Sequence, residues 1–205
     1  MKVYNFSPGP AKLDSSIISK SQEAMYNFQN TGLSILEIGH RSKEFEKLMN
    51  SLQENIRNIF NVPTNYFTLF LQGGATFQNT FIANNFDMRD KDLGCLVTGT
   101  WGKNTFDDFS KIRETKLIEL SQDEIENFVE SGEDLKNVDY LHLTSNETIN
   151  GIQLREFNKI NHDSLLIDMS SDIGSYRFEW DNVAYIYAGA QKNMGIPGVS
   201  ICIGD

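Results

Sequence analysis

The chain has 205 residues, of which 40% are hydrophobic and 22% are charged, and its formal net charge is −10. This length allows one domain with a sizeable core and is too short for two large ones, so we expect a single globular domain. The acidic balance argues against a general nucleic-acid binder, because neutralising phosphates requires a basic surface, and a small-molecule substrate fits better.

The N-terminus, MKVYNFSPGP, has no apolar core followed by a small-residue cleavage site, so it does not resemble a secretory signal. The longest apolar runs fall far short of a membrane span, and we expect a cytoplasmic protein with no membrane association. Cys95 and Cys202 each lie in an apolar run, where a free buried thiol is more typical than a disulfide.

Two helices are predicted from local patterns. Apolar residues recur at three- and four-residue steps from Ser42 to Phe60, which indicates an amphipathic helix. A second helix is predicted at 121–130, because Ser121 and Glu124 have the spacing of a capping box and Gly132 follows.

Six short apolar runs have the length of β-strands and alternate with helical segments, at 66–71, 94–98, 139–143, 164–168, 183–187 and 198–203. This alternation predicts an α/β fold, with a mostly parallel sheet flanked by helices. Ligands of such sheets bind outside the carboxyl ends of the strands. The polar motifs that follow five of these runs should therefore meet at one edge of the sheet.

The first of these motifs, QGGATFQNTF, follows the run at 66–71 and leads into a probable helix. Its two glycines would let the backbone approach an anion, the N–H groups of the helix start are unpaired, and Thr76 adds a hydroxyl next to Ala75. The motif is thus a candidate phosphate site. An ordinary tight turn is the alternative, since the motif matches neither the Walker pattern nor the dinucleotide fingerprint.

Asp168 and Lys192 are candidates for cofactor chemistry. Asp168 closes an apolar run, where a buried carboxylate could pair with a protonated pyridine nitrogen or simply cap a turn. Lys192 lies in YIYAGAQKNMGIPG, a confined setting in which a lysine loses its proton more easily and can act as an amine nucleophile. Neither residue is specific alone, and their weight comes from the shared sheet edge.

Further ligand contacts are possible at Trp101, Thr148 and Arg41. Trp101 is flanked by glycines in TGTWGKN, which is typical of an exposed loop, where its ring could stack on a planar cofactor or fill the core. Thr148 could hydrogen-bond a ring substituent or belong to an ordinary turn. Arg41, next to His40, could hold a carboxylate or phosphate, or lie solvated. The histidines and cysteines show no metal-ligand spacing, so no metal site is expected.

Together these motifs resemble the phosphoserine aminotransferases, a family within class V of the fold-type I pyridoxal-phosphate enzymes. The resemblance covers nearly the whole chain and rests on NFSPGPAKL at 5–13, GHRSKEF at 39–45, QGGAT at 72–76, TWG at 100–102, NETINGI at 146–152, DMSSDI at 168–173 and YAGAQKNMGIPG at 187–198. It implies reversible transfer of the amino group from glutamate to 3-phosphohydroxypyruvate, giving phosphoserine and 2-oxoglutarate in serine biosynthesis. Some relatives also serve pyridoxine biosynthesis.

The resemblance also implies roles for the candidate residues. Lys192 would carry pyridoxal 5′-phosphate as a Schiff base and shuttle a proton, Asp168 would pair with the pyridinium nitrogen, and Trp101 would stack on the ring. The remaining roles are phosphate binding by Ala75, Thr76 and Gln191, contact with the ring oxygen by Thr148, and substrate binding by Arg41 and His40.

Members of this family are considerably longer, with more of the large domain and a C-terminal small domain after the lysine segment. We therefore expect 1–205 to be the N-terminal segment and most of the cofactor-binding large domain of a longer, homodimeric protein. The arginine that grips the substrate α-carboxylate would lie outside this chain, so little turnover is expected from the chain alone. Alternatives are another class V activity, such as alanine–glyoxylate transamination or cysteine desulfuration, and a truncated non-catalytic domain that binds the cofactor.

Overall fold

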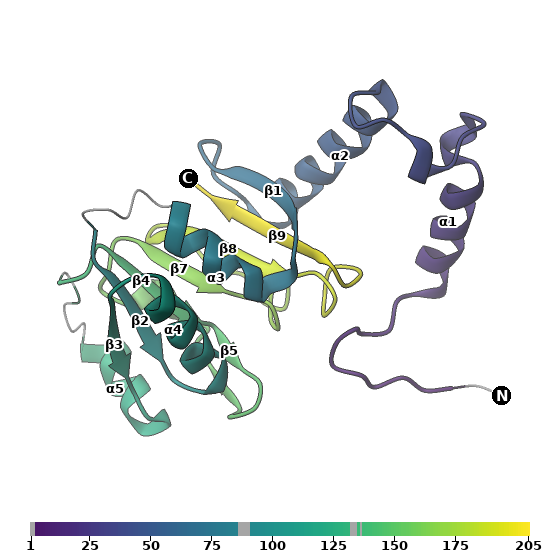
Figure 1. Ribbon diagram of the computed structural model, residues 1–205. Coiled ribbons are helices and arrows are strands. Elements are labelled where there is room, and N and C mark those ends of the chain that lie inside the picture. Colours follow the sequence, from purple (N-terminus) through teal and green to yellow (C-terminus); the bar gives the residue numbers. More distant parts are fainter. Residues whose placement is uncertain (1–2, 86–90, 132–134, 136) are drawn as a thin grey trace.

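The computed structural model describes residues 3–85, 91–131, 135 and 137–205. Its centre is a seven-stranded sheet with the strand order β1-β9-β8-β7-β4-β2-β3 (Figure 1). The strands are β1 (Phe67–Gln72), β2 (Leu93–Val97), β3 (Thr115–Glu119), β4 (Tyr140–Thr144), β7 (Leu165–Asp168), β8 (Val183–Gly189) and β9 (Val199–Gly204). A separate two-stranded hairpin consists of β5 (Asn146–Glu147) and β6 (Ile152–Gln153).

Strand direction decides where the candidate motifs lie. The neighbours β3, β2, β4, β7 and β8 are all parallel. β9 is antiparallel to β8 and β1 is antiparallel to β9, so β1 again points the same way as β8. The predicted, mostly parallel sheet is confirmed, and the strands that carry the five motifs all end at one edge.

The predicted elements are present, with bounds moved by a residue or two. The six apolar runs form strands, and the two predicted helices are α2 (Lys43–Phe60), with Ser42 as its N-cap, and α5 (Gln122–Ser131). The proposed capping residue Glu124 accepts a hydrogen bond from the Ser121 N–H at 2.8 Å. Gly132 lies outside the described residues. The sequence patterns did not predict β3 or the short hairpin.

The helices cover both faces of the sheet (Figure 1). α3 (Gly74–Asn85) and α4 (Thr100–Ile112) pack on one face, where Ile82 and Phe109 share a core cluster with Leu166. α2 and α5 contribute to the core on the other face, together with Leu165 and Ile167. Side chains alternate between the two faces along β7, as the period of a strand requires, so Asp168 lies on the same face as Leu166.

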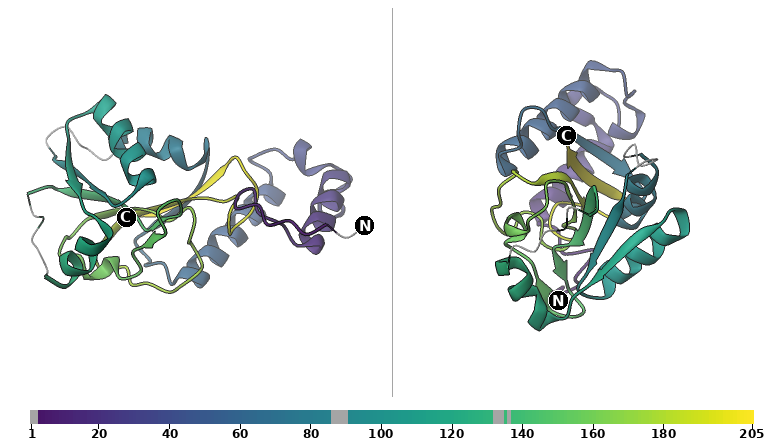
Figure 2. Two further views of the ribbon diagram at one scale, coloured as in Figure 1. Left: turned by 90° about the horizontal axis from the view of Figure 1, so that it is seen from below. Right: turned by 90° about the vertical axis from the view of Figure 1, so that its left-hand side faces the viewer.

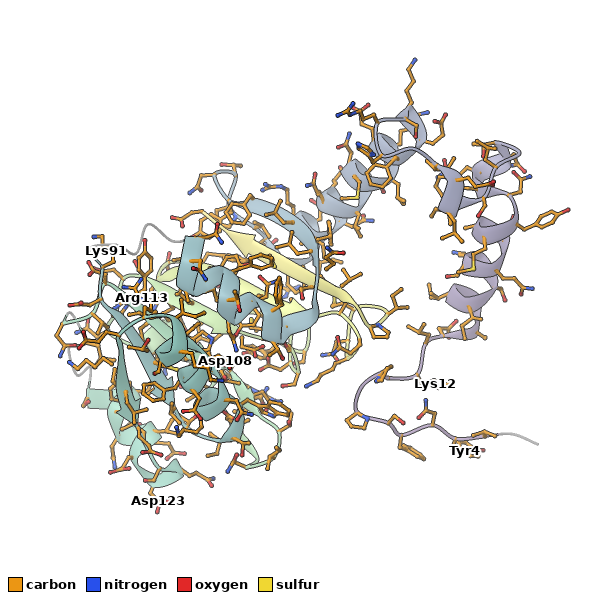
Figure 3. The ribbon with its side chains drawn as sticks, viewed as in Figure 1. Tyr4, Lys12, Lys91, Asp108, Arg113 and Asp123 are labelled. Atoms are coloured by element: carbon orange, nitrogen blue, oxygen red, sulfur yellow. The ribbon has the colours of Figure 1, made fainter. Side chains whose placement is uncertain are left out.

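The N-terminal arm extends away from the sheet (Figures 1 and 2). It contains α1 (Ser15–Tyr26), which buries none of its residues, and the short helical turns η1 (Phe28–Asn30) and η2 (Ile35–Glu37). Figure 3 shows Tyr4 and Lys12 on this arm. None of the helices in the described part of the chain is long and apolar enough to cross a membrane.

A buried polar network ties α3 to the sheet. The His142 ring lies 3.8 Å from the Cys95 sulfur through Nδ1 and 3.0 Å from the Tyr187 hydroxyl through Nε2. Tyr187 donates to Asn79 Oδ1 at 3.2 Å, so its oxygen is the acceptor for a proton on His142 Nε2. Burial lowers the pKa of His142 to about 3, and the ring is neutral in the fold. Cys95 is a free buried thiol, as the sequence predicts, and so is Cys202.

Acid should destabilise the chain through His142. An unfolded histidine takes up a proton below a pKa of about 6.5, whereas His142 in the fold stays neutral down to a pKa of about 3. The contribution of His142 to the free energy of unfolding is complete above pH ~6.5. It falls by up to ~1.4 kcal/mol per pH unit as the pH drops from there toward the folded pKa of about 3. Urea titrations from pH 7 to 4 measure this slope.

The substitution His142→Phe, which removes the titrating ring, should flatten the slope even though it lowers stability at neutral pH. His40→Gln removes a histidine from an exposed turn and serves as the matched control, with a slope like that of the unmodified chain. Equal slopes for the unmodified chain and His142→Phe would contradict this assignment.

Candidate active site

A cavity of about 590 Å³ opens at the carboxyl edge of the sheet and extends between α3 and α4, from the first turn of α4 at Trp101 to its last turn at Lys111. Most of the residues predicted from sequence contribute to its wall, namely Ala75, Thr76, Trp101, Asp168, Gln191 and Lys192. Thr148, Arg41 and His40 are not part of the wall. The expected convergence is therefore confirmed for the motifs that follow β1, β2, β4, β7 and β8, the motif after β4 contributing Asn146.

The start of α3 offers an anion-binding surface. β1 ends at Gln72, and the chain turns into the helix through Gly73 (φ 100°) and Gly74 (φ 71°), a left-handed conformation that side chains with a Cβ rarely adopt. Within the described residues, no acceptor is seen for the N–H groups of 74–76. These donors and the positive end of the helix dipole face the cavity beside Ala75 and Thr76.

Asp168 supplies a carboxyl group at the cavity wall. It is the last residue of β7 and lies between Thr144 of β4 and Tyr187 of β8 in the sheet register. Desolvation raises the pKa of Asp168, while a hydrogen bond from the Ser170 N–H at 2.8 Å and the charge of Lys192 oppose this shift. A cation placed beside this carboxyl would favour its ionised form.

Lys192 and Trp101 face each other across the same cavity. The Lys192 Nζ lies 5.7 Å from the centroid of the Trp101 ring, within the range of a cation–π contact. The N-terminal arm crosses the lysine segment, where the Ala11 N–H donates to the Gln191 carbonyl at 2.9 Å. A Cβ on Gly9 would lie 3.2 Å from Lys192 Cγ, so a glycine lets the arm approach closely.

The expectation that Trp101 lies in an exposed loop is wrong. Trp101 belongs to the first turn of α4, with 41% of its surface exposed. Its indole Nε1 donates to the Thr148 hydroxyl at 3.0 Å, so Thr148 is close to the cavity through the ring it contacts. The glycines on either side of Trp101 suggested a loop because the residues that cap this helix lie far away in the sequence.

His40 and Arg41 occupy an exposed turn that precedes α2. Neither lines the cavity, and the start of α2 lies on the side of the N-terminal arm (Figure 1). Their role in substrate binding stays a prediction.

Several cavity residues were missed by the sequence reasoning. Thr144 closes β4, and its Oγ1 is buried without a hydrogen-bond partner among the described residues. Ser171 lines the cavity and accepts a hydrogen bond through Oγ, at 2.9 Å, from the amide of Asn146, which belongs to the predicted motif after β4. Ser170 accepts a hydrogen bond from the Gly189 N–H at 3.1 Å. These residues could have been found by the rule that identified Asp168, which is to look for polar residues at or directly after the end of an apolar strand.

This set of groups fits a flat, phosphorylated pyridine cofactor. The start of α3 suits the phosphate, the Asp168 carboxyl suits a protonated ring nitrogen, and the Trp101 ring suits a planar surface. The unpaired atoms Thr144 Oγ1 and Gln191 Oε1 are further polar contacts for a bound group. In the described part of the chain, no three His, Cys, Asp or Glu side chains are grouped in a way that could hold a metal ion.

A parallel sheet that brings a lysine, a carboxylate, an aromatic ring and an open helix start to one edge defines a pyridoxal-phosphate type of transferase domain. The sequence matches the family described as aminotransferase class-V over residues 3–205, and the chain belongs to this family. The resemblance inferred from the motifs is thereby confirmed.

Phosphoserine aminotransferases are among the proteins to which this chain is similar. One from Geobacillus kaustophilus (strain HTA426) is 40% identical over 206 residues, covering 98% of this chain and 57% of the relative. The solved structure of phosphoserine aminotransferase from Bacillus circulans subsp. alkalophilus has a TM-score of 0.88 at 35% identity, covering 99% of this chain and 57% of that one. The solved structure of pyridoxal-phosphate-bound phosphoserine aminotransferase from Trichomonas vaginalis has a TM-score of 0.83 at 30% identity, covering 99% of this chain and 58% of that one. The chain thus spans a little over half the length of these relatives.

Asp168→Asn should stabilise the chain in the absence of cofactor at neutral pH. In the unfolded chain this carboxyl ionises above a pKa of about 4, whereas the raised pKa in the fold delays ionisation. The unmodified chain therefore loses stability relative to Asp168→Asn as the pH rises above the unfolded pKa of about 4. The loss ends where the carboxyl also ionises in the folded chain. The amide keeps the acceptor for the Ser170 N–H, so the change is isosteric.

Thermal unfolding of both forms at pH 4 and pH 7 tests this, and we expect the higher melting temperature for Asp168→Asn only at pH 7. Asp163→Asn, on an exposed turn, is a control for the loss of one negative charge. A variant that is less stable at both pH values would show that desolvation does not control Asp168.

Proposed function

We propose that this chain is the cofactor-binding part of a pyridoxal-phosphate-dependent aminotransferase that moves an amino group between glutamate and 3-phosphohydroxypyruvate, giving phosphoserine and 2-oxoglutarate. The observation that carries the proposal is the meeting of Lys192, Asp168 and Trp101 in one cavity. The similarity to phosphoserine aminotransferases over 98% of the chain supports the choice of substrates. Serine biosynthesis in the cytoplasm is the corresponding role, with pyridoxine biosynthesis as a second use.

The cofactor would be held by groups on four strand ends. The N–H groups of Ala75 and Thr76, with the Gln191 amide, bind the phosphate. The Asp168 carboxylate would keep a proton on the ring nitrogen, and the Trp101 ring would stack on the pyridine. The Thr148 hydroxyl accepts from the indole, so its own O–H is available to donate to the ring oxygen.

The chemistry then depends on where protons are held. When bound, pyridoxal phosphate supplies an electron sink for the negative charge that develops at the substrate α-carbon. Asp168 maintains this sink by retaining the proton at the ring nitrogen. The Lys192 amine would hold the cofactor and, once displaced by the amino group of the substrate, would take the proton from the substrate α-carbon and return it during the second half of the reaction. Trp101 limits access of water to the ring.

We further propose that the full-length protein is a homodimer in which Arg41 and His40 bind the substrate acid. The N-terminal arm carries large apolar side chains that are mostly in water, including Phe6 at 89% exposure and Leu36 at 79%. Such a surface is typical of an interface. A second copy that covers the arm would also bring the turn before α2 close to another protein surface.

Lys192→Ala should abolish covalent attachment of the cofactor. The purified chain mixed with pyridoxal phosphate should develop a visible absorption band that survives gel filtration, and the variant should lose it because the amine that reacts with the aldehyde is removed. Lys111→Ala is the matched control, since Lys111 also lines the cavity and pairs with Asp108 at 2.9 Å. A band that persists in Lys192→Ala, or that disappears in Lys111→Ala alone, would contradict the assignment of Lys192.

The chain of residues 1–205 should bind the cofactor but transaminate slowly, with kcat/KM at least ~30-fold below that of a protein extended to the length of its relatives. The reason is that the described residues lining the cavity include lysines but no arginine, and loss of charged, bidentate recognition of a carboxylate costs roughly 2–5 kcal/mol. A coupled assay of both forms with glutamate measures the difference.

The same assay separates the candidate activities when 3-phosphohydroxypyruvate, glyoxylate and pyruvate are compared as acceptors. The phosphorylated acceptor should react fastest in the extended protein. Preference for an unphosphorylated acceptor would favour another class V activity, and equal rates in the short and extended forms would contradict the need for further chain.

A further inference from the structure

The proposed site leaves Glu147 without a role, although this side chain lies directly behind Trp101. Glu147 is fully buried, at 0% exposure, in the short strand β5. Its Oε2 accepts a hydrogen bond from the Trp101 N–H at 2.8 Å, and its Oε1 accepts one from the Gly102 N–H at 2.6 Å. One carboxylate therefore binds two consecutive N–H groups in the first turn of α4.

The first turn of α4 has no local side-chain cap, because the residue before it is Gly99. The missing partners come instead from the turn at 147–150. Glu147 serves the second and third N–H groups, and Asn150 Oδ1 accepts from the Thr100 N–H at 3.0 Å. Because the free N–H groups of a helix start require acceptors, this distant turn fixes the position of the helix end.

The glycines beside Trp101 have the same explanation. A Cβ on Gly99 would lie 2.8 Å from carbon atoms of the Glu147 side chain, and one on Gly102 would lie 3.1 Å from Glu147 Oε1. Gly99 has an extended backbone with φ −174°, which any residue can adopt, so a glycine is required here for space. The pattern Gly-Thr-Trp-Gly thus makes room for a buried carboxylate.

Trp101 is held at both ends by neighbouring residues of one segment. Glu147 binds its backbone N–H, and Thr148 binds its indole Nε1 at 3.0 Å. The ring held in this way is the one that lies 5.7 Å from Lys192 Nζ. We infer that Glu147 is a positioning residue that sets the orientation of the Trp101 ring over the cofactor. The role over a cofactor rests on the proposed function, whereas the hydrogen bonds that position Trp101 do not depend on it.

The test uses the whole chain labelled with 5-fluorotryptophan. The sequence contains two tryptophans, so fluorine NMR gives two resonances, and Trp101→Phe assigns them. Trp180 is buried and donates to the Phe60 carbonyl at 2.9 Å, which makes its resonance an internal report on folding. Glu147→Gln keeps the size of the side chain but turns one acceptor into a donor that faces an N–H group.

Without cofactor, Glu147→Gln should shift and broaden the Trp101 resonance and leave the Trp180 resonance in place. Asn150→Ala is the matched control, because it removes a cap from the same helix without touching Trp101. An unmoved Trp101 resonance, an equal effect of Asn150→Ala, or loss of both native resonances would overturn the inference, the last because Glu147 would then be a general stabilising residue.

Titration with pyridoxal phosphate adds the functional readout. The affinity of Glu147→Gln should fall by roughly two- to tenfold, the range expected when one aromatic stacking contact is weakened. An affinity equal to that of the unmodified chain, despite a shifted Trp101 resonance, would overturn the role over the cofactor. If the unmodified chain itself fails to bind pyridoxal phosphate, the proposed function fails, while the cofactor-free spectra still decide whether Glu147 positions Trp101.

Discussion

The candidate site depends on one constraint, which is that the strands carrying its residues all end at the same edge of the sheet. β9 runs against both of its neighbours, and this double reversal gives β1 the direction of β8. With a single reversal, the glycine turn after β1 would lie at the opposite edge, more than a strand length from Asp168 and Lys192. The antiparallel strand in an otherwise parallel sheet is therefore what allows the start of α3 to reach the cavity.

On the face of the sheet that α3 and α4 cover, the buried polar groups are neutral and the ionisable groups lie at the cavity. Below the cavity, His142 is held neutral by burial, and its hydrogen bonds with Tyr187 and Cys95 satisfy the ring without placing a charge in the core. At the rim, Asp168 and Lys192 are ionisable groups of opposite sign, and burial raises the pKa of Asp168. A carboxyl with a raised pKa at a cavity mouth is typical of functional sites, whereas a neutral, hydrogen-bonded network in the core is typical of structural support.

Sequence reasoning succeeded where the signal was local. Apolar runs followed by polar residues identified six strands and the residues at their ends. In five of these strands, β2, β4, β7, β8 and β9, burial on both faces accounts for the continuous apolar stretch. β3 was missed because TKLIE mixes charged and apolar residues at a partly exposed position. Trp101 was placed in a loop because its helix cap, Glu147, lies 46 residues away. Contacts of that kind follow from the tertiary fold and leave no mark in the local pattern.

The two helix starts at the cavity differ in a way that orients a bound ligand. At α4, the positive end of the helix faces the Glu147 carboxylate, so a phosphate placed there would meet a negative group that already holds the N–H donors. At α3, the donors of 74–76 have no acceptor among the described residues. An anion is thus directed to α3, and the side of the cavity next to α4 is left for a ring. The asymmetry of capping, rather than the presence of glycines in both turns, distinguishes the proposed phosphate end of the site from the proposed stacking end.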